Sequence, residues 1–199
     1  LLIVVAISMA LTLLAQGIKG VPLVNSSVTT VSQSADSKEK TTVTEQETSA
    51  RIMANGDLLY HDIIYISAKK ADGTYDFHEN FEYVKPWLKQ ADLVLGDFEG
   101  TVNKDHYLAG YPLFNAPGEV MDAIKDAGYQ VLDLAHNHIL DSQIEGVVST
   151  ADAIEKAGMT PVGVYTHESR SEAPLVIKEV NGIKVAILAY SYGFNGIEQ

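Results

Sequence analysis

Three short polar clusters hold the residues most able to do chemistry in this 199-residue chain. Each follows a short apolar run: Gly-Asp at residues 56–57, Gly-Asp-Phe-Glu at residues 96–99, and His-Asn-His at residues 136–138 with Asp141 close behind. Carboxylates, imidazoles and amides are the oxygen and nitrogen donors that Mg, Mn, Zn or Fe ions take from proteins. The chain has no cysteine, so thiolate ligands and disulfides are excluded.

The elements expected around these clusters would bring them to one edge of a sheet. Apolar runs predict strands at residues 51–55, 93–95, 131–135 and 161–164, and helices at residues 77–90, 117–127 and 142–157. Asn181-Gly182 separates two further strands and is typical of a type I′ hairpin turn. The alternation predicts an α/β layered fold with a mostly parallel sheet, helices on its faces and a C-terminal β-hairpin. Ligands bind beyond the carboxyl ends of such strands, where the three clusters would converge.

The metal hypothesis gives the clustered residues individual roles. The expected metal ligands are Asp57, Asp97, Glu99, Asn137 and His138. The candidate catalytic residues are His138, His136 and Asp141, with either histidine acting as a general acid. A glycine before each of the first two aspartates is expected to let the backbone turn sharply beside a ligand. Structural roles are the alternative, because Gly-Asp is also an ordinary turn and Asp141 can be the N-cap of the following helix.

The first 50 residues differ in character from the rest. Residues 1–20 are apolar with no charge before Lys19, which favours a membrane anchor; a cleaved signal segment and a buried core helix are the alternatives. Residues 21–50 are expected to be a disordered tether, because a Ser/Thr-rich stretch without aromatic residues buries too little apolar surface to order itself. We therefore expect a single-pass protein of the cell membrane, with an α/β domain over residues 51–199 outside the cytoplasm.

The chain is acidic, with a formal net charge of −12. Nucleic-acid binding relies on clustered Lys and Arg, so this balance argues against a nucleic-acid partner. It does not exclude other anionic ligands, because a bound divalent cation reverses the local sign of charge.

Four motifs of the domain resemble those of the CapA-like poly-γ-glutamate capsule biosynthesis family, which is related to the calcineurin-type metallophosphoesterases. Residues 135–141, Ala-His-Asn-His-Ile-Leu-Asp, are similar to the family's ANNHxxD signature. Residues 96–100 are similar to its NLEG element, residues 114–117 to its F-x-x-P segment, and residues 190–196 to its YTYGTNG stretch. The resemblance covers roughly residues 51–199.

The resemblance implies a membrane-anchored, extracytoplasmic component of poly-γ-glutamate capsule synthesis or export with a divalent-metal cleft. The implied partners are poly-γ-glutamate or a related anionic polymer and the membrane subunits of the capsule synthase. It also implies an N-terminal fragment, with further histidines in a C-terminal part beyond Gln199. Two alternatives stay open: a metal-dependent hydrolase of phosphoesters or γ-glutamyl amides, and a non-catalytic polymer-binding module. The sequence does not decide whether the protein is an enzyme.

The sequence departs from these relatives at several site positions. Leu59 stands where calcineurin-like enzymes have the histidine of Asp-x-His, and His61, two residues further on, is not expected to replace it. His136 and Asp97 stand where the CapA-like motifs have asparagine. Both of these replacements keep a metal-binding side chain.

Overall fold

Four parallel strands form the central sheet of the computed structural model, which describes residues 2–7, 47–165 and 175–197. In spatial order they are β2 (Ile52–Asp57), β3 (Leu93–Asp97), β4 (Val131–Asp133) and β5 (Thr160–Val162). The register pairs Asp57 with Asp97 and Asp97 with Asp133. Three acidic residues therefore end three neighbouring strands at the same edge of the sheet.

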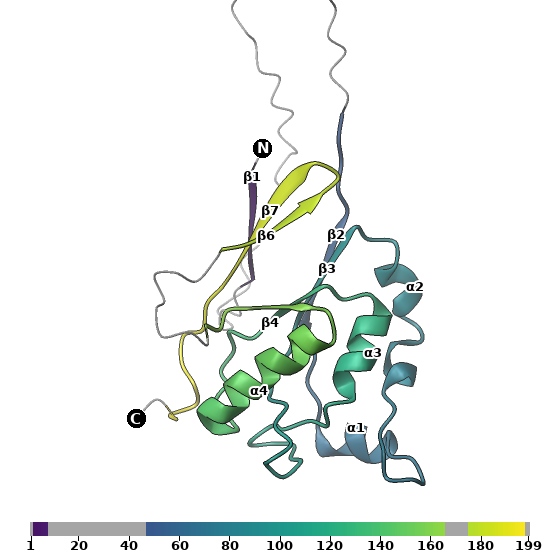
Figure 1. Ribbon diagram of the computed structural model, residues 1–199, viewed down its shortest axis with the longest axis vertical. Helices are drawn as coiled ribbons and strands as arrows, with labels where there is room; N and C mark the ends of the chain where they lie inside the picture. The colour runs from purple at the N-terminus through teal and green to yellow at the C-terminus, as the bar shows by residue number, and fades with distance from the viewer. Residues whose placement is uncertain (1, 8–46, 166–174, 198–199) are drawn as a thin grey trace, which may run out of the picture. The chain divides into compact units, whose positions relative to one another are not determined.

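Helices cover one face of this sheet. They are α1 (Asp62–Ser67), the 3-10 helix η1 (His78–Phe81), α2 (Lys85–Leu88), α3 (Val120–Ala127) and α4 (Gln143–Lys156). Their apolar residues pack with Val94 and Leu132 of the sheet in the larger of two hydrophobic cores. As the sequence predicts, α3 ends at Gly128, whose positive φ of 118° closes the helix. Figure 1 shows the chain leaving the carboxyl end of β2 and turning directly toward α1.

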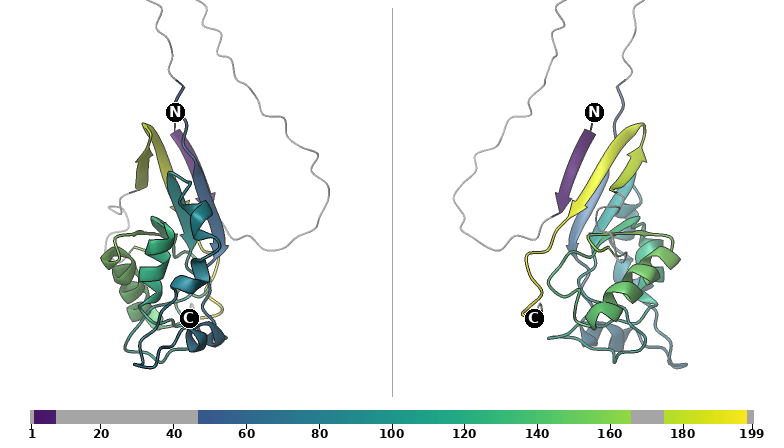
Figure 2. Two further views of the ribbon diagram at one scale, coloured as in Figure 1. Left: turned by 90° about the vertical axis from the view of Figure 1, so that its right-hand side faces the viewer. Right: turned by 60° about the vertical axis from the view of Figure 1, so that its left-hand side comes forward.

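A second, smaller sheet covers the other face. Strands β6 (Val176–Val180) and β7 (Ile183–Ala189) form the predicted antiparallel hairpin, and the positive φ angles of Asn181 and Gly182 fit the predicted type I′ turn. β1 (Leu2–Ile7) pairs with β7 in parallel (Figure 2). The second core joins residues of β3, β4 and β5 to residues of β6 and β7. Because successive side chains of a strand point to opposite faces, the parallel sheet is filled on both sides, and the predicted α/β layered fold is confirmed.

Two local expectations are wrong, and one helix was not predicted. The helix predicted over residues 77–90 is two short helices, because Pro86 lacks an N–H and stands in the first turn of α2. Helix α1 was not expected, since six residues are too few to show a helical period. Gly56 and Gly96 do not make sharp turns: both lie within strands, and neither has a positive φ.

The structure describes only part of the first 50 residues. Strand β1 belongs to the apolar segment for which a membrane anchor or signal is expected. The remainder of that segment and residues 21–46 of the expected tether lie outside the described residues. Within the residues that are described, no helix is long and apolar enough to cross a membrane.

Candidate functional site

The site is built around a group of carboxyl side chains at the ends of β2 and β3. Asp97 and Glu99 are 3% and 7% exposed, and Asp57 beside them is exposed. One oxygen of each buried carboxyl, Asp97 Oδ1 and Glu99 Oε2, has no hydrogen-bond partner. Within the described residues, no Lys or Arg forms an ion pair with either side chain. Buried charge without a partner is costly, so this arrangement favours either protonation or a bound cation.

The pKa values of these carboxyls are raised for that reason. Burial, followed by the nearby charges of Asp133 and Asp57, raises the pKa of Asp97 to about 7. Burial, followed by the adjacent Asp57 carboxyl, raises the pKa of Glu99 to about 8. Groups with raised pKa values that lie together at a sheet edge are typical of functional sites, although structural clusters show them too.

Asp133 belongs to the same group, and the sequence analysis did not single it out. It ends β4, is 4% exposed, and accepts a hydrogen bond from the Ala135 N–H at 2.8 Å. Burial raises its pKa to about 6 despite backbone N–H groups that act in the opposite direction. A carboxyl inside the apolar run Val131–Leu134 was the signal available in the sequence.

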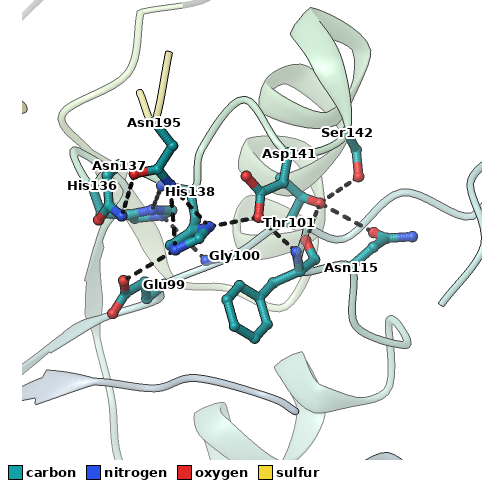
Figure 3. Close-up of polar contacts among 11 residues, drawn as sticks. Glu99, Gly100, Thr101, Asn115, His136, Asn137, His138, Asp141, Ser142 and Asn195 are labelled. Carbon is teal, nitrogen blue, oxygen red and sulfur yellow. Dashed lines mark hydrogen bonds and ion pairs between the residues drawn. The ribbon is translucent and has the colours of Figure 1, made fainter. Parts of the chain in front are cut away.

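His138 lies between two carboxyl groups. Its Nδ1 is 2.8 Å from Asp141 Oδ2, and its Nε2 is 3.9 Å from Glu99 Oε1 (Figure 3). An ionised carboxylate can only accept, so Nδ1–H of His138 donates to Asp141, and Nε2 is the ring nitrogen that faces Glu99. The structure thus brings His138, Glu99 and Asp141 together as the strand-end pattern predicts.

Asp141 supports His138 and does not cap the following helix. Its Oδ2 also accepts the Phe114 N–H at 2.6 Å, and its Oδ1 is buried without a partner. The N-cap of α4 is Ser142, which makes no capping hydrogen bond through its side chain. Burial raises the pKa of Asp141, and the contacts with Phe114 and His138 act in the opposite direction. Of the two roles open to Asp141 in the sequence, the geometry favours the one at the site.

His136 is a poor candidate for proton transfer. It is 3% exposed; the His138 N–H donates to its Nδ1 at 3.1 Å, and the Gly100 N–H lies 3.4 Å from its Nε2. Burial, followed by the neighbouring His138 imidazole, lowers its pKa to about 3. A histidine that stays neutral at physiological pH is not a general acid, so His138 is the candidate left for that role.

Asn137 lies at the rim of the site, where it meets a residue that the sequence analysis did not choose. Its Nδ2 donates to Asn195 Oδ1 at 3.1 Å. Asn195 Nδ2 in turn lies 3.4 Å from both ring nitrogens of His138. The signal for Asn195 was its position in residues 190–196, one of the four motif-like stretches.

A buried polar network holds the loop beneath the site. Thr101 Oγ1 donates to the Phe114 carbonyl at 2.8 Å and lies 2.5 Å from Ser142 Oγ, and Asn115 Oδ1 accepts the Asn103 N–H at 2.8 Å. The Phe114 ring meets the His138 ring edge to face, with centroids 4.7 Å apart. This network joins the two ends of the loop, residues 101–103 and 114–115, to the start of α4, and Phe114 in turn contacts His138.

The donor types at the site fit a divalent cation, although the ligands are not grouped around one. No three His, Asp or Glu side chains among the described residues are arranged closely enough to hold a metal ion. The 3.9 Å between His138 Nε2 and Glu99 Oε1 is longer than a hydrogen bond and shorter than two metal–ligand bonds of about 2.0–2.2 Å each. One ion can therefore contact both atoms. His61 is not part of this set, since its ring packs edge to face on Phe114 at 4.9 Å.

Comparison with known proteins finds capsule and PGA biosynthesis proteins among those similar to this chain. The family model described as "Bacterial capsule synthesis protein PGA_cap" matches residues 51–199. The capsule biosynthesis protein CapA of Bacillus anthracis is 34% identical over 119 residues, which are 57% of this chain and 29% of that protein. The PGA biosynthesis protein CapA of Bacillus subtilis (strain 168) is 28% identical over 114 residues, 56% of this chain and 30% of that protein.

The chain thus spans less than a third of the length of these curated relatives. The family match covers the whole α/β domain, including the three strand-end clusters and the segment that carries Asn195. The chain belongs to the family of bacterial capsule synthesis proteins described as PGA_cap.

Proposed function

We propose that this chain is part of a membrane-anchored, extracytoplasmic component of poly-γ-glutamate capsule synthesis or export, and that its site binds a divalent cation. The cation would first contact Glu99 and His138, and the side chains of Asp57 and Asp97, which are not grouped around one point, would have to close on it, with Asn137 at the rim. The observation that carries the proposal is the pair of buried carboxyls, Asp97 and Glu99, each with an unpartnered oxygen.

A cation at this position is supported by the charges around it. The carboxyl groups of Asp57, Asp97, Glu99 and Asp133 repel one another, and the raised pKa values of Asp97 and Glu99 record that repulsion together with burial. A divalent ion would relieve it and would keep the carboxylates ionised at neutral pH. Asp141 would act as an outer partner, because it holds the Nδ1–H of His138 and turns Nε2 toward the ion.

The same cation would explain how an acidic protein handles an anionic polymer. The chain has a formal net charge of −12, and poly-γ-glutamate carries a carboxylate on every residue, so direct contact between them is repulsive. An ion held by the buried carboxyls can accept a polymer carboxylate as a further ligand at the exposed Asp57 side of the site. Residues of the apolar N-terminal segment outside β1 would keep this site near the membrane, where the synthase subunits would deliver the polymer.

Metal titration tests the proposal directly. The full chain, stripped with a chelator, is titrated with Mn²⁺, and bound ion is measured by electron paramagnetic resonance. We expect one ion bound per chain in the wild type, and a loss of affinity of at least about 10-fold in Asp97→Ala and His138→Ala. In cells that depend on this protein for capsule, both variants should reduce the capsule while staying in the membrane fraction. Absence of Mn²⁺, Mg²⁺, Zn²⁺ and Fe²⁺ binding by the wild type would overturn the metal site, and full capsule production by both variants would overturn its role.

One observation favours a second candidate function, a metal-dependent hydrolase. The buried His138–Asp141 pair, 2.8 Å apart, is the arrangement in which a carboxylate orients an imidazole for proton transfer. A bound divalent ion would supply a more acidic water molecule and a positive charge for the developing oxyanion. Water would add across a γ-glutamyl amide to give a carboxylate and an amine. In this function His138 would not be a ligand of the ion, and it would carry a proton from the attacking water to the leaving amine.

Substrate assays separate the two functions. Metal-loaded protein is incubated with poly-γ-glutamate and with p-nitrophenyl phosphate, and polymer length and released nitrophenol are measured. Shortening of the polymer that His138→Gln abolishes would support the γ-glutamyl hydrolase. Release of nitrophenol would support a phosphoesterase. Cation binding without turnover of either substrate would leave the polymer-binding role.

A further inference from the structure

We propose that Asn195 is a positioning residue for His138: its amide rests on the face of the imidazole ring and keeps Nε2 open toward Glu99. This inference deepens the proposed function, in which Nε2 of His138 receives the cation, and it rests on that function for its significance. Asn195 lies 57 residues from His138 in the sequence, in the segment that follows β7.

The distances place the Asn195 amide over the ring. Its Nδ2 is 3.4 Å from Nδ1 and 3.4 Å from Nε2 of His138. An atom equally distant from these two nitrogens and lying in the ring plane would collide with the carbon between them, so the amide must lie above the face. An amide N–H can interact weakly with the π face of a ring. The contact with Asn195 therefore leaves His138 Nε2 open within the plane of the ring.

Three contacts restrict the orientation of the His138 ring. Asp141 holds Nδ1 within the ring plane at 2.8 Å, and Phe114 meets the ring edge to face with centroids 4.7 Å apart. Asn195 covers the face, and its Oδ1 is held in turn by the Asn137 Nδ2 at 3.1 Å (Figure 3). Without Asn195 the ring keeps its hydrogen bond to Asp141 but can tilt about it, which moves Nε2 away from Glu99.

The segment that carries Asn195 is built to present this side chain. Asn195 has a φ of 55°, a left-handed conformation that asparagine tolerates better than most residues. The turn around it is closed by the Ile197 N–H, which donates to the Phe194 carbonyl at 3.0 Å. Phe194 packs against the larger hydrophobic core. The backbone is thus anchored on both sides of a side chain that reaches back to the site.

The test uses two substitutions that remove different parts of the contact. Asn195→Gly deletes the amide and accommodates the positive φ. Asn195→Asp keeps an oxygen that can accept from Asn137 but has no N–H to place over the ring. Asn181→Gly is the matched control, because Asn181 also has a positive φ, of 51°, and lies in the hairpin turn. Long-range ¹H–¹⁵N spectra of the metal-free full chain report the ring nitrogens and carbon-bound protons of His138, assigned with His138→Gln, and amide spectra confirm that each variant is folded.

We expect both Asn195 variants to shift and broaden the His138 ring signals, and Asn195→Gly to weaken Mn²⁺ binding by about 10-fold, while Asn181→Gly changes neither. Unchanged ring signals in both variants would overturn the inference. A change in Asn195→Gly alone would also overturn it, because Asn195 would then act through Asn137 and not through its own N–H. Altered ring signals in a protein that binds no cation would support the positioning role and reject the proposed function, so the two can fail separately.

Discussion

The contacts of the two ring nitrogens of His138 are set by Asp141, three residues further along the chain. Asp141 holds the Nδ1 proton, and Nε2 faces Glu99, so the ring is prepared to accept a cation or to exchange a proton on one side only. This asymmetry distinguishes His138 from its neighbour His136, whose Nδ1 accepts the His138 N–H and whose Nε2 lies 3.4 Å from the Gly100 N–H.

Asp141→Asn should therefore weaken the site without removing a ligand. The amide can still accept from the Phe114 N–H, but it binds the His138 Nδ1–H less strongly than a carboxylate does. We expect Mn²⁺ affinity to fall about 10- to 100-fold, the usual effect of losing an outer partner of a histidine ligand. Isothermal titration calorimetry of the full chain measures this change.

The chain offers a matched control for that experiment. His78 Nδ1 lies 2.7 Å from Asp76 Oδ1 in an equivalent histidine–carboxylate pair. Both of these side chains are about half exposed, and neither belongs to the cluster of buried carboxyls at the strand ends. Asp76→Asn should leave Mn²⁺ affinity unchanged. Equal losses in the two variants would indicate a general electrostatic effect and would contradict the specific role of Asp141.

Among the structural elements, β3 is closely packed beside the site. Gly96 precedes Asp97, and a Cβ at Gly96 would lie 2.8 Å from Tyr129 Cε1 and 3.0 Å from Leu58 Cδ1. Tyr129 is buried, so it cannot move aside freely. Gly96→Ala should lower the free energy of unfolding by about 1–3 kcal/mol, the typical cost of overpacking. Urea denaturation of the full chain measures it.

Gly56 provides the comparison for this prediction. It precedes Asp57 in β2 as Gly96 precedes Asp97 in β3, but nothing lies within 4 Å of a Cβ built at Gly56. Gly56→Ala should be neutral or slightly stabilising, because alanine restricts the unfolded chain more than glycine does. A similar destabilisation at both positions would show that the glycines serve the strand backbone and not the packing of Tyr129.

The positions of the strands along the chain and the edge at which the polar clusters meet could be predicted from the sequence. Apolar runs ending in Gly-Asp or His-Asn-His mark strand ends, and parallel βα units bring those ends together. Other features depend on tertiary contacts that no local pattern encodes. The aspartate of β4 becomes part of the site only through its register with Asp97, and Asn195 reaches His138 from a loop 57 residues away. The role of Gly96 was also invisible, since it depends on where Tyr129 packs.

At the scale of the whole molecule, exposed acidic residues and buried carboxyls differ in what they cost the stability of the fold. Exposed acidic residues cost little, because water and salt screen them. The buried carboxyls are not screened and must bind either protons or a cation. The stability of the whole domain should therefore depend on pH and on metal together.

The metal-free full chain should become more stable as the pH falls from 8.5 to 6.5. Asp97 and Glu99 have folded-state pKa values of about 7 and about 8, against ordinary values of 3.8 and 4.5. In this range the folded state takes up protons that the unfolded chain does not, so the free energy of unfolding should rise, by an amount on the order of 1–3 kcal/mol. Below pH 6.5 the rise should continue toward the ordinary carboxyl pKa values, offset in part by His136, whose pKa is lowered to about 3 and which is protonated only in the unfolded chain.

Urea denaturation at pH 6.5 and 8.5, with and without Mn²⁺, checks this dependence. Glu99→Gln removes the carboxyl with the highest of these pKa values, so most of the difference between the two pH values should disappear. Saturating Mn²⁺ should stabilise the wild type more at pH 8.5 than at pH 6.5, because the cation competes with protons for the same carboxylates. Two results would contradict this prediction: equal stability of the metal-free wild type at both pH values, or a Glu99→Gln variant that keeps the full difference. Either would mean that the clustered carboxyls do not repel one another enough for a bound cation to stabilise the fold by neutralising them.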